Sequence, residues 1–260
     1  MRERVAPGAN EQSAVARGVL VRSVTRMTEV FLERDFKAYE KHRQDDPEYN
    51  ALRLSVRRKL KAMVDGVLKE AKALGTDMSA QAGLHHPYTF NAYRVREQRA
   101  YLCRGTKERK KLATFFGEAL GKDAETHYIQ TVLEICIDDQ IVEAALRIHP
   151  QAWWDGEHFK KRVLQDPARM EELCLLLRAL PAGFNLKLHD WKKDHWCGQA
   201  KPNEIKEMLQ HYTPGNHWLH VQRQLPKEDA ITLGEQAEAW VRSSLLALLP
   251  IYRFTLWDPS

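Results

Sequence analysis

The sequence predicts an α+β fold in which helices cover a mainly antiparallel sheet. Three observations support this prediction. Apolar residues recur with helical spacing early in the chain, alternating segments typical of strands follow, and later strands and helices do not alternate regularly. The 260 residues are 43% hydrophobic, which is enough for a sizeable core. We expect a flexible arm over 1–15 and one domain over 16–260.

Two helices are predicted at the start of this domain. An apolar stripe from Leu20 to Phe31 predicts a long helix that ends near His42. Asp46 and Pro47 are typical of a helix start, and the next helix is expected to end at Gly75. Its apolar face consists of Leu52, Val56, Leu60, Met63 and Val67. The two helices predict an N-terminal helical hairpin over about 16–75.

After a predicted loop at 75–87, the pattern changes to strands. The segment "TFNAYRVREQRAYLC" places Tyr93, Val95 and Tyr101 on one face of a predicted strand. The segments "THYIQTVLEICIDD" and "IVEAALRIHP" predict a hairpin that turns at Asp138 and Asp139.

Helices return in the last part of the chain. "DPARMEELCLLLRAL" and "PNEIKEMLQHY" predict helices, while "FNLKLHDW" and "HWLHVQRQL" predict strands. Thr232 to Glu235 fits a capping box for a last helix, which we expect Pro250 to stop.

Composition limits the protein class. The four cysteines are far apart and show no C-x-x-C spacing, which is typical of reduced thiols inside cells. The N-terminus does not resemble a signal peptide, and no apolar run reaches the ~18 residues of a membrane span. We therefore expect a cytoplasmic protein with no membrane partner.

Charge is distributed unevenly along the chain. Residues 1–111 hold 24 Lys or Arg against 14 Asp or Glu, whereas the remainder is net acidic. The excess peaks in "YRVREQRAYLCRGTKERKK", which predicts a surface for nucleic acid or a nucleotide. Its phosphate-binding candidates, with two from the preceding helix, are Arg94, Arg96, Arg99, Arg104, Lys107, Arg109, Lys110, Lys111, Arg53 and Arg57. Tyr93 and Tyr101 are the candidates for base stacking. The alternative is a solvated charged face.

Acidic residues suggest a different function. Glu134, Asp138 and Asp155 could hold a divalent metal for phosphoester hydrolysis, although Asp138 is also an ordinary turn residue. A divalent metal is the only cofactor considered, and only under this alternative.

"LHDWKKDHWCG" offers a further set of possible ligands or acid–base groups. They are His189, Asp190, His195 and Cys197. Their spacing matches no established zinc site, and packed, hydrogen-bonded side chains are the simpler interpretation.

The order of elements resembles one known group. A helical N-terminus leads to "FNAYRVREQRAYL", then to the hairpin "VLEICIDDQIVEAALRI", and finally to a helix ending in "LLPIYRF". This order is similar to that of the YktB-like group of bacterial domains of unknown function. The resemblance implies an α+β fold and no particular chemistry.

Three functional hypotheses result. The first is binding of a phosphate-rich partner through the basic strand and the adjoining helix. The second is a metal-dependent hydrolase, and the third is a non-catalytic subunit of a larger bacterial assembly. No motif in the sequence identifies a reaction.

Overall fold

The computed structural model describes residues 30–116, 126 and 128–257, so the predicted arm at 1–15 lies outside the described residues. A seven-stranded antiparallel sheet forms the centre, with strand order β1-β2-β3-β4-β7-β5-β6. The strands are β1 Met78–Ala82, β2 Gln98–Arg104, β3 Val132–Ile137, β4 Ile141–Ile148, β5 Phe184–Leu188, β6 His195–Trp196 and β7 Leu219–Pro226. The predicted α+β class with a mainly antiparallel sheet is therefore confirmed.

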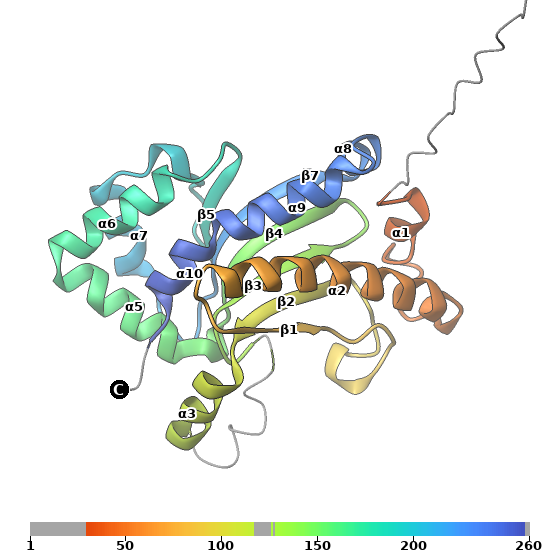
Figure 1. Cartoon of the computed structure of the whole chain (residues 1–260), viewed down its shortest axis with the longest axis horizontal. Helices are drawn as coiled ribbons and strands as arrows, with labels where there is room; N and C mark the ends of the chain where they lie inside the picture. The colour runs from red at the N-terminus through yellow and green to blue at the C-terminus, as the bar shows by residue number, and fades with distance from the viewer. Residues whose placement is uncertain (1–29, 117–125, 127, 258–260) are drawn as a thin grey trace, which may run out of the picture.

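Helices pack against this sheet, as Figure 1 shows. The α-helices are α1 Glu33–Lys37, α2 Asn50–Ala73, α3 Thr106–Phe116, α5 Trp153–Gln165, α6 Pro167–Arg178, α7 Pro202–His211, α8 Lys227–Thr232, α9 Gln236–Ala247 and α10 Leu249–Thr255. Short 3₁₀ turns are η1 Pro47–Tyr49, η2 Thr89–Asn91, η3 Pro150–Ala152 and η4 Cys197–Gln199.

The predicted hairpin is confirmed as β3 and β4, because both strands alternate as the pleat requires. Leu133, Ile135 and Ile137 are buried in the main core, whereas Glu134 points to the opposite face. Asp138 closes the turn. Its Oδ1 accepts hydrogen bonds from the backbone N–H of Gln140 at 2.7 Å and of Ile141 at 2.8 Å.

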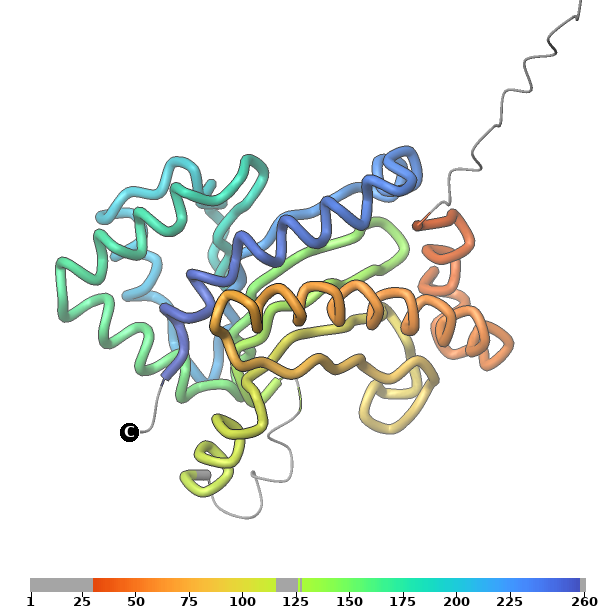
Figure 2. The backbone as a smooth tube through the Cα atoms, in the orientation of Figure 1, coloured from red at the N-terminus to blue at the C-terminus, as the bar shows by residue number. Residues whose placement is uncertain are grey.

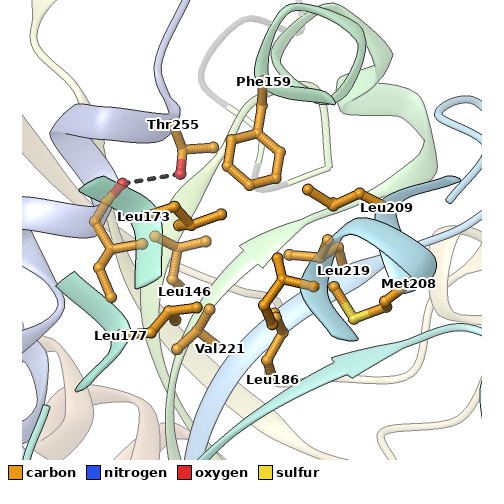
Figure 3. Close-up of a pocket in the computed structure, with 12 residues that line it drawn as sticks. Leu146, Phe159, Leu173, Leu177, Leu186, Met208, Leu209, Leu219, Val221 and Thr255 are labelled. Atoms are coloured by element: carbon orange, nitrogen blue, oxygen red, sulfur yellow. Dashed lines mark hydrogen bonds between the residues drawn. The ribbon is translucent and has the colours of Figure 1, made fainter. Parts of the chain in front are cut away.

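One face of the sheet is covered by α2, α5, α6, α7, α9 and α10. α2 contacts β1 and β2, and α9 lies beside α2 over β3 and β4 (Figure 2). α5, α6, α7 and α10 cover β4, β7 and β5 with leucine, phenylalanine and methionine side chains. The space that they leave is an apolar void of about 10 Å³ (Figure 3), which is part of the core rather than a ligand site.

The other face of the sheet is polar. Alternation along the strands places Arg99, Glu134, Glu143, Arg147 and His220 on this face. Burying arginine and glutamate costs desolvation free energy, which their mutual attraction must offset. This face therefore does not stabilise the fold by hydrophobic burial in the way that the apolar face does.

Some predicted elements differ in the structure. Residues 75–87 were expected to form a loop, yet they contain β1, a short edge strand. The predicted strand from Thr89 begins only at Gln98, because Ala92 and Tyr93 adopt left-handed backbone conformations, with φ of 49° and 57°, that a strand excludes.

The helix ends also differ. Pro250 does not stop the last helix but lies in the first turn of α10, where its missing N–H costs no hydrogen bond. The first helix of the predicted hairpin falls largely outside the described residues, and between residues 30 and 46 only α1 is helical.

No helix in the described ranges is long and apolar enough to span a lipid bilayer. Cys103, Cys136, Cys174 and Cys197 are all buried and unpaired with one another.

Candidate functional site

The predicted basic residues do not form one surface. Arg94 and Arg96 are exposed before β2, and Lys107, Lys110 and Lys111 are exposed on α3 after it. The first group precedes β2 and the second lies on α3, which follows β2 in Figure 1. The seven residues of β2 span about 20 Å at ~3.3 Å per residue. The remaining arginines of the run point into the molecule.

Several of the inward arginines have structural partners. Arg53 is fully buried, and its guanidinium donates to the carbonyl oxygens of Ala38 at 3.3 Å and Asp46 at 3.0 Å. Arg57 Nε donates to Gly83 O at 2.8 Å, and Arg109 Nη1 donates to the carbonyl oxygen of Arg104 at 3.1 Å. These side chains support the fold and are not presented to a polymer.

Tyr101 also points inward. It is only 6% exposed and packs with Cys103 and Val132, so its ring does not offer a stacking surface. Tyr93, by contrast, is 60% exposed. The structure therefore leaves one of the two predicted stacking residues on the surface.

Tyr93 belongs to a segment of exposed aromatic residues between β1 and β2, which we call the aromatic loop and define as residues 84–96. Phe90 is 85% exposed, Tyr88 is 48% exposed and Leu84 is 45% exposed. The rings of Tyr88 and Phe90 stack with centroids 5.9 Å apart. Such a concentration of exposed rings is typical of an interaction surface.

Hydrogen bonds hold the aromatic loop in one shape. Asn91 Oδ1 accepts from the N–H of Tyr88 at 2.7 Å, and Asn91 Nδ2 donates to His86 O at 2.9 Å. The N–H of Val95 donates to Gln44 O at 2.8 Å, which ties the end of the loop to the body. These hydrogen bonds hold Tyr93 in its left-handed backbone conformation. Strained backbone of this kind persists only where surrounding contacts hold it, and it is common at binding sites.

Positive charge surrounds part of the aromatic loop. Burial lowers the pKa of His85, and His86, Arg57 and Arg58 lower this pKa further. Within the described ranges, Arg58, Arg94 and Arg96 form no ion pair. The exposed Asp45 and Glu48 follow Gln44, so negative charge borders the end at Val95.

A second candidate site is a cavity of about 280 Å³ on the polar face of the sheet, which we call the sheet-face cavity. It is lined by Arg99, Glu134, Arg147, His149, Trp218 and His220. Polar groups that converge in a cavity mark the default location of a ligand site.

Glu134 is part of the cavity lining and lies between two arginines. In the register, it opposes Tyr101 on β2 and Ala145 on β4, so Arg99 and Arg147 reach it diagonally. Arg147 Nε is 2.7 Å from Glu134 Oε1, and Arg99 Nη1 is 3.6 Å from Oε2.

These contacts leave Glu134 unusual for a buried group. Its side chain is completely buried, yet neither carboxylate oxygen has a hydrogen-bond partner among the described residues. Arg147 Nε is close enough to Glu134 Oε1 for an ion pair, but the geometry of this contact is not that of a hydrogen bond. A buried acceptor without a donor is a feature that a ligand could complete.

Two outer carboxylates complete the charge row. Glu97 pairs with Arg99, and Glu143 Oε1 is 2.5 Å from Arg147 Nη2. The order Glu97–Arg99–Glu134–Arg147–Glu143 alternates in sign, so the row contains three carboxylates and two guanidiniums. Nearby, the Cys136 Sγ donates to Glu97 Oε2 at 3.2 Å, and burial raises the pKa of this thiol to about 12.

The two histidines in the cavity are neutral at neutral pH. Burial lowers the pKa of His149, and Arg99 and Arg147 reinforce this effect. Burial also places the pKa of His220 well below its ordinary value, again with help from Arg147. The His220 ring stacks on Trp218 with centroids 4.3 Å apart, which gives the cavity one aromatic wall.

The predicted metal ligands are engaged elsewhere. Asp138 caps the turn between β3 and β4, and Asp155 forms a buried pair with Arg104, whose Nη1 is 2.9 Å from Asp155 Oδ2. No group of three or more His, Cys, Asp or Glu side chains within the described residues could hold a metal ion. The structure therefore does not bring Glu134, Asp138 and Asp155 together as one site.

The residues of "LHDWKKDHWCG" are held mainly by packing. His189 stacks on His217 with centroids 5.8 Å apart, and His195 Nε2 accepts from Trp191 Nε1 at 3.0 Å. Cys197 is buried, which raises the pKa of its thiol to about 12, and Asp190 is exposed. These contacts agree with the simpler interpretation of packed, hydrogen-bonded side chains.

Sequence reasoning found Arg99 and Glu134 but did not place them in one cavity, and it missed Arg147, His149, Trp218 and His220. The alternation of polar and aliphatic residues in three strands could have indicated this polar face. "VLEICI", "IVEAALRI" and "LHVQRQLP" all carry polar residues on the face opposite their aliphatic residues.

No protein-family model matches the chain, and no curated protein is similar enough to count as a match. The resemblance to the YktB-like group therefore stays a prediction, and function rests on the geometry described above.

Proposed function

We propose that the protein binds single-stranded nucleic acid through the aromatic loop. The observation that carries this proposal is the exposure of Phe90 and Tyr93, at 85% and 60%, on a loop fixed by its own hydrogen bonds. Large apolar rings are normally withdrawn from water, so rings held in solvent suit a partner that stacks on them.

Neighbouring charge selects the kind of partner. Arg58, Arg94 and Arg96 have no ion-pair partner among the described residues, and guanidinium groups pair readily with phosphate. Aromatic rings next to phosphate-binding arginines are the combination with which proteins hold unpaired bases. Bases inside a duplex offer no free faces for such stacking, so single strands are the preferred form.

A longer strand has a second region of contact in the proposal. Lys107, Lys110 and Lys111 are exposed on α3, which is separated from the aromatic loop by the length of β2, about 20 Å. We therefore expect affinity to increase with oligonucleotide length until both regions are engaged. The proposal also assigns the protein to the cytoplasm, which is supported by four buried cysteines that form no disulfide with one another.

The test is fluorescence anisotropy with labelled single-stranded and duplex oligonucleotides over a salt series. The double variant Phe90→Ala/Tyr93→Ala is expected to lose at least about tenfold in affinity, because stacking contributes ~1–3 kcal/mol per base. Leu175→Ala is the matched control, since Leu175 is an exposed apolar residue on α6. It should bind like the native protein.

A second pair of variants tests the charge. Arg94→Gln/Arg96→Gln should reduce the salt slope by about 1.4, at ~0.7 per phosphate contact on a single strand. Arg169→Gln/Arg178→Gln on α6 is the control, since both of these arginines lie in exposed ion pairs. Equal affinity for duplex and single strand, or binding unchanged in the aromatic variant, would contradict the proposal.

The other two hypotheses have less support. A metal-dependent hydrolase would need ligands that converge, and Asp155 is occupied by Arg104. A non-catalytic subunit would use the aromatic loop as a protein-docking surface. Light scattering with candidate partner proteins would favour that role if the native protein fails to bind any oligonucleotide at low salt.

A further inference from the structure

We propose that the sheet-face cavity binds a small, neutral, planar heterocycle through a lactam edge, in which a ring N–H lies beside a carbonyl oxygen. Guanine and uracil carry such an edge. The cavity and the aromatic loop are different parts of the molecule, so this inference does not depend on the proposed function.

Glu134 has unfilled hydrogen-bonding capacity. Its two carboxylate oxygens are buried and accept no hydrogen bond in the part of the chain that the structure describes. Leaving such an acceptor without a donor is unfavourable, and hydrogen bonds to a charged group are among the stronger ones. A ligand that places an N–H donor against Glu134 would remove this deficit.

The flanking arginines can supply a hydrogen-bond donor. A guanidinium carries five N–H donors, and the contacts of Arg147 to Glu134 and Glu143 involve its Nε and Nη2. Its Nη1 takes part in neither of these contacts, and Arg147 lines the cavity, so we assign Nη1 as the donor to a ligand. Donor and acceptor groups that lie next to each other match the carbonyl and N–H of a lactam.

The charge around Glu134 disfavours an anionic ligand. The row from Glu97 to Glu143 holds three carboxylates and two guanidiniums, and the two histidines are uncharged at neutral pH. A phosphate placed against Glu134 would add negative charge where the fixed charges already sum to less than zero. A neutral ligand avoids this repulsion.

Shape supports the same class of ligand. Trp218 and His220, whose rings stack on each other, both line the cavity, and an aromatic lining suits a planar ring. A cavity of about 280 Å³ is slightly smaller than the ~300–1,000 Å³ pockets of drug-sized ligands. The expected occupant is therefore a free base or nucleoside rather than a polymer.

The experiment is isothermal titration calorimetry of the native protein with four nucleosides and inorganic phosphate. Guanosine and uridine, which carry the lactam edge, should bind at least tenfold more tightly than adenosine and cytidine, which lack a ring N–H donor. Phosphate should neither bind nor compete. Equal binding of all four nucleosides, binding of phosphate, or no binding of guanosine and uridine at millimolar concentration would overturn the proposal.

Variants locate the site. Glu134→Gln should weaken guanosine and uridine binding at least tenfold, and Trp218→Leu, which leaves the charge row intact, should weaken it severalfold. Glu172→Gln changes an exposed glutamate on α6 and should bind normally. A thermal melt establishes that each variant is folded. Unchanged binding in both cavity variants would also reject the proposal, even if the nucleoside selectivity is as expected.

The two proposals can fail separately. Saturating guanosine should leave the affinity for a labelled oligonucleotide unchanged, because the nucleoside occupies the cavity and the strand occupies the aromatic loop. If guanosine displaces the oligonucleotide, the two ligands share one site and the sheet-face cavity is not a distinct one.

Discussion

Two buried carboxylates, Asp155 and Glu134, face arginines in different parts of the molecule and differ in how completely they are satisfied. Asp155 accepts from Arg104 at 2.9 and 2.5 Å and from the N–H and hydroxyl of Thr131, both at 2.9 Å. The N–H of Trp257 adds a further bond at 3.2 Å. Glu134 has arginines nearby but no hydrogen bond among the described residues.

This difference separates a structural pair from a possible binding group. Asp155 has no remaining capacity, and its partners join β2, α5 and the C-terminal segment into one unit. Glu134 keeps unused acceptors in a cavity. Both carboxylates lie next to arginines, so charge pairing alone does not distinguish a structural carboxylate from a binding one. The number of hydrogen bonds that each carboxylate accepts does distinguish them.

The largest expected effect comes from the satisfied pair. Asp155→Asn should lower the free energy of unfolding by about 3–5 kcal/mol, because it leaves the buried Arg104 guanidinium without its counter-charge. Guanidinium chloride unfolding measures this loss. Glu172→Gln should stay within about 0.5 kcal/mol of the native protein. A loss for Asp155→Asn as small as that of the control would refute the assigned role of the pair.

Acid should act on the same pair. Burial alone would raise the pKa of Asp155. The Arg104 guanidinium and several hydrogen bonds outweigh burial and hold this pKa below its ordinary value. The stabilisation is then fully present above the unfolded-state pKa of ~3.9 and is lost as pH falls through the lower folded-state value. The gap in melting temperature between the native protein and Asp155→Asn should therefore narrow only below about pH 4. A gap that closes between pH 6 and 5 would contradict this.

Removing the charge of the unsatisfied carboxylate should cost less stability. Glu134→Gln is expected to lower the free energy of unfolding by about 1–2 kcal/mol, since Arg99 and Arg147 keep Glu97 and Glu143 as partners. The same unfolding experiment measures it. If Glu134→Gln costs as much as Asp155→Asn, Glu134 is a structural residue and the contrast between the two carboxylates disappears.

The smallest effect on stability should come from the aromatic loop. Phe90→Ala removes a ring that is 85% exposed, so the free energy of unfolding should change by less than about 0.5 kcal/mol. Its effect should be confined to oligonucleotide binding. A large destabilisation, measured by the same melts, would mean that the ring supports the fold and is not held out for a partner.

The sequence predicted the fold class and the central hairpin because alternation in "VLEICI" and "IVEAALRI" is strong on both strands. It missed β1 because "MSAQA" is short and half-buried at a sheet edge, where the pattern is weak. It misread "TFNAYR" as a strand because nothing in the residue types signals left-handed backbone at Ala92 and Tyr93.

The candidate sites were predictable only in part. Local charge density located Arg94, Arg96 and Tyr93, but it could not tell these exposed side chains from Arg104, which pairs with a residue 51 positions later. The sheet-face cavity joins β2, β3, β4 and the segment around β7. Such a site depends on strand order, and strand order is set by tertiary packing rather than by local pattern.

The position of β7 has a consequence for how the chain is made. β7 pairs with β4 on one side and β5 on the other, so it joins a meander of four earlier strands to the β5–β6 hairpin. Until residues 219–226 have been synthesised, no strand can join these two groups, so the edges of β4 and β5 that β7 covers have no partner strand. Partly made chains should therefore be prone to intermolecular strand pairing, and a ribosome stalled before β7 would carry the most vulnerable form of the molecule.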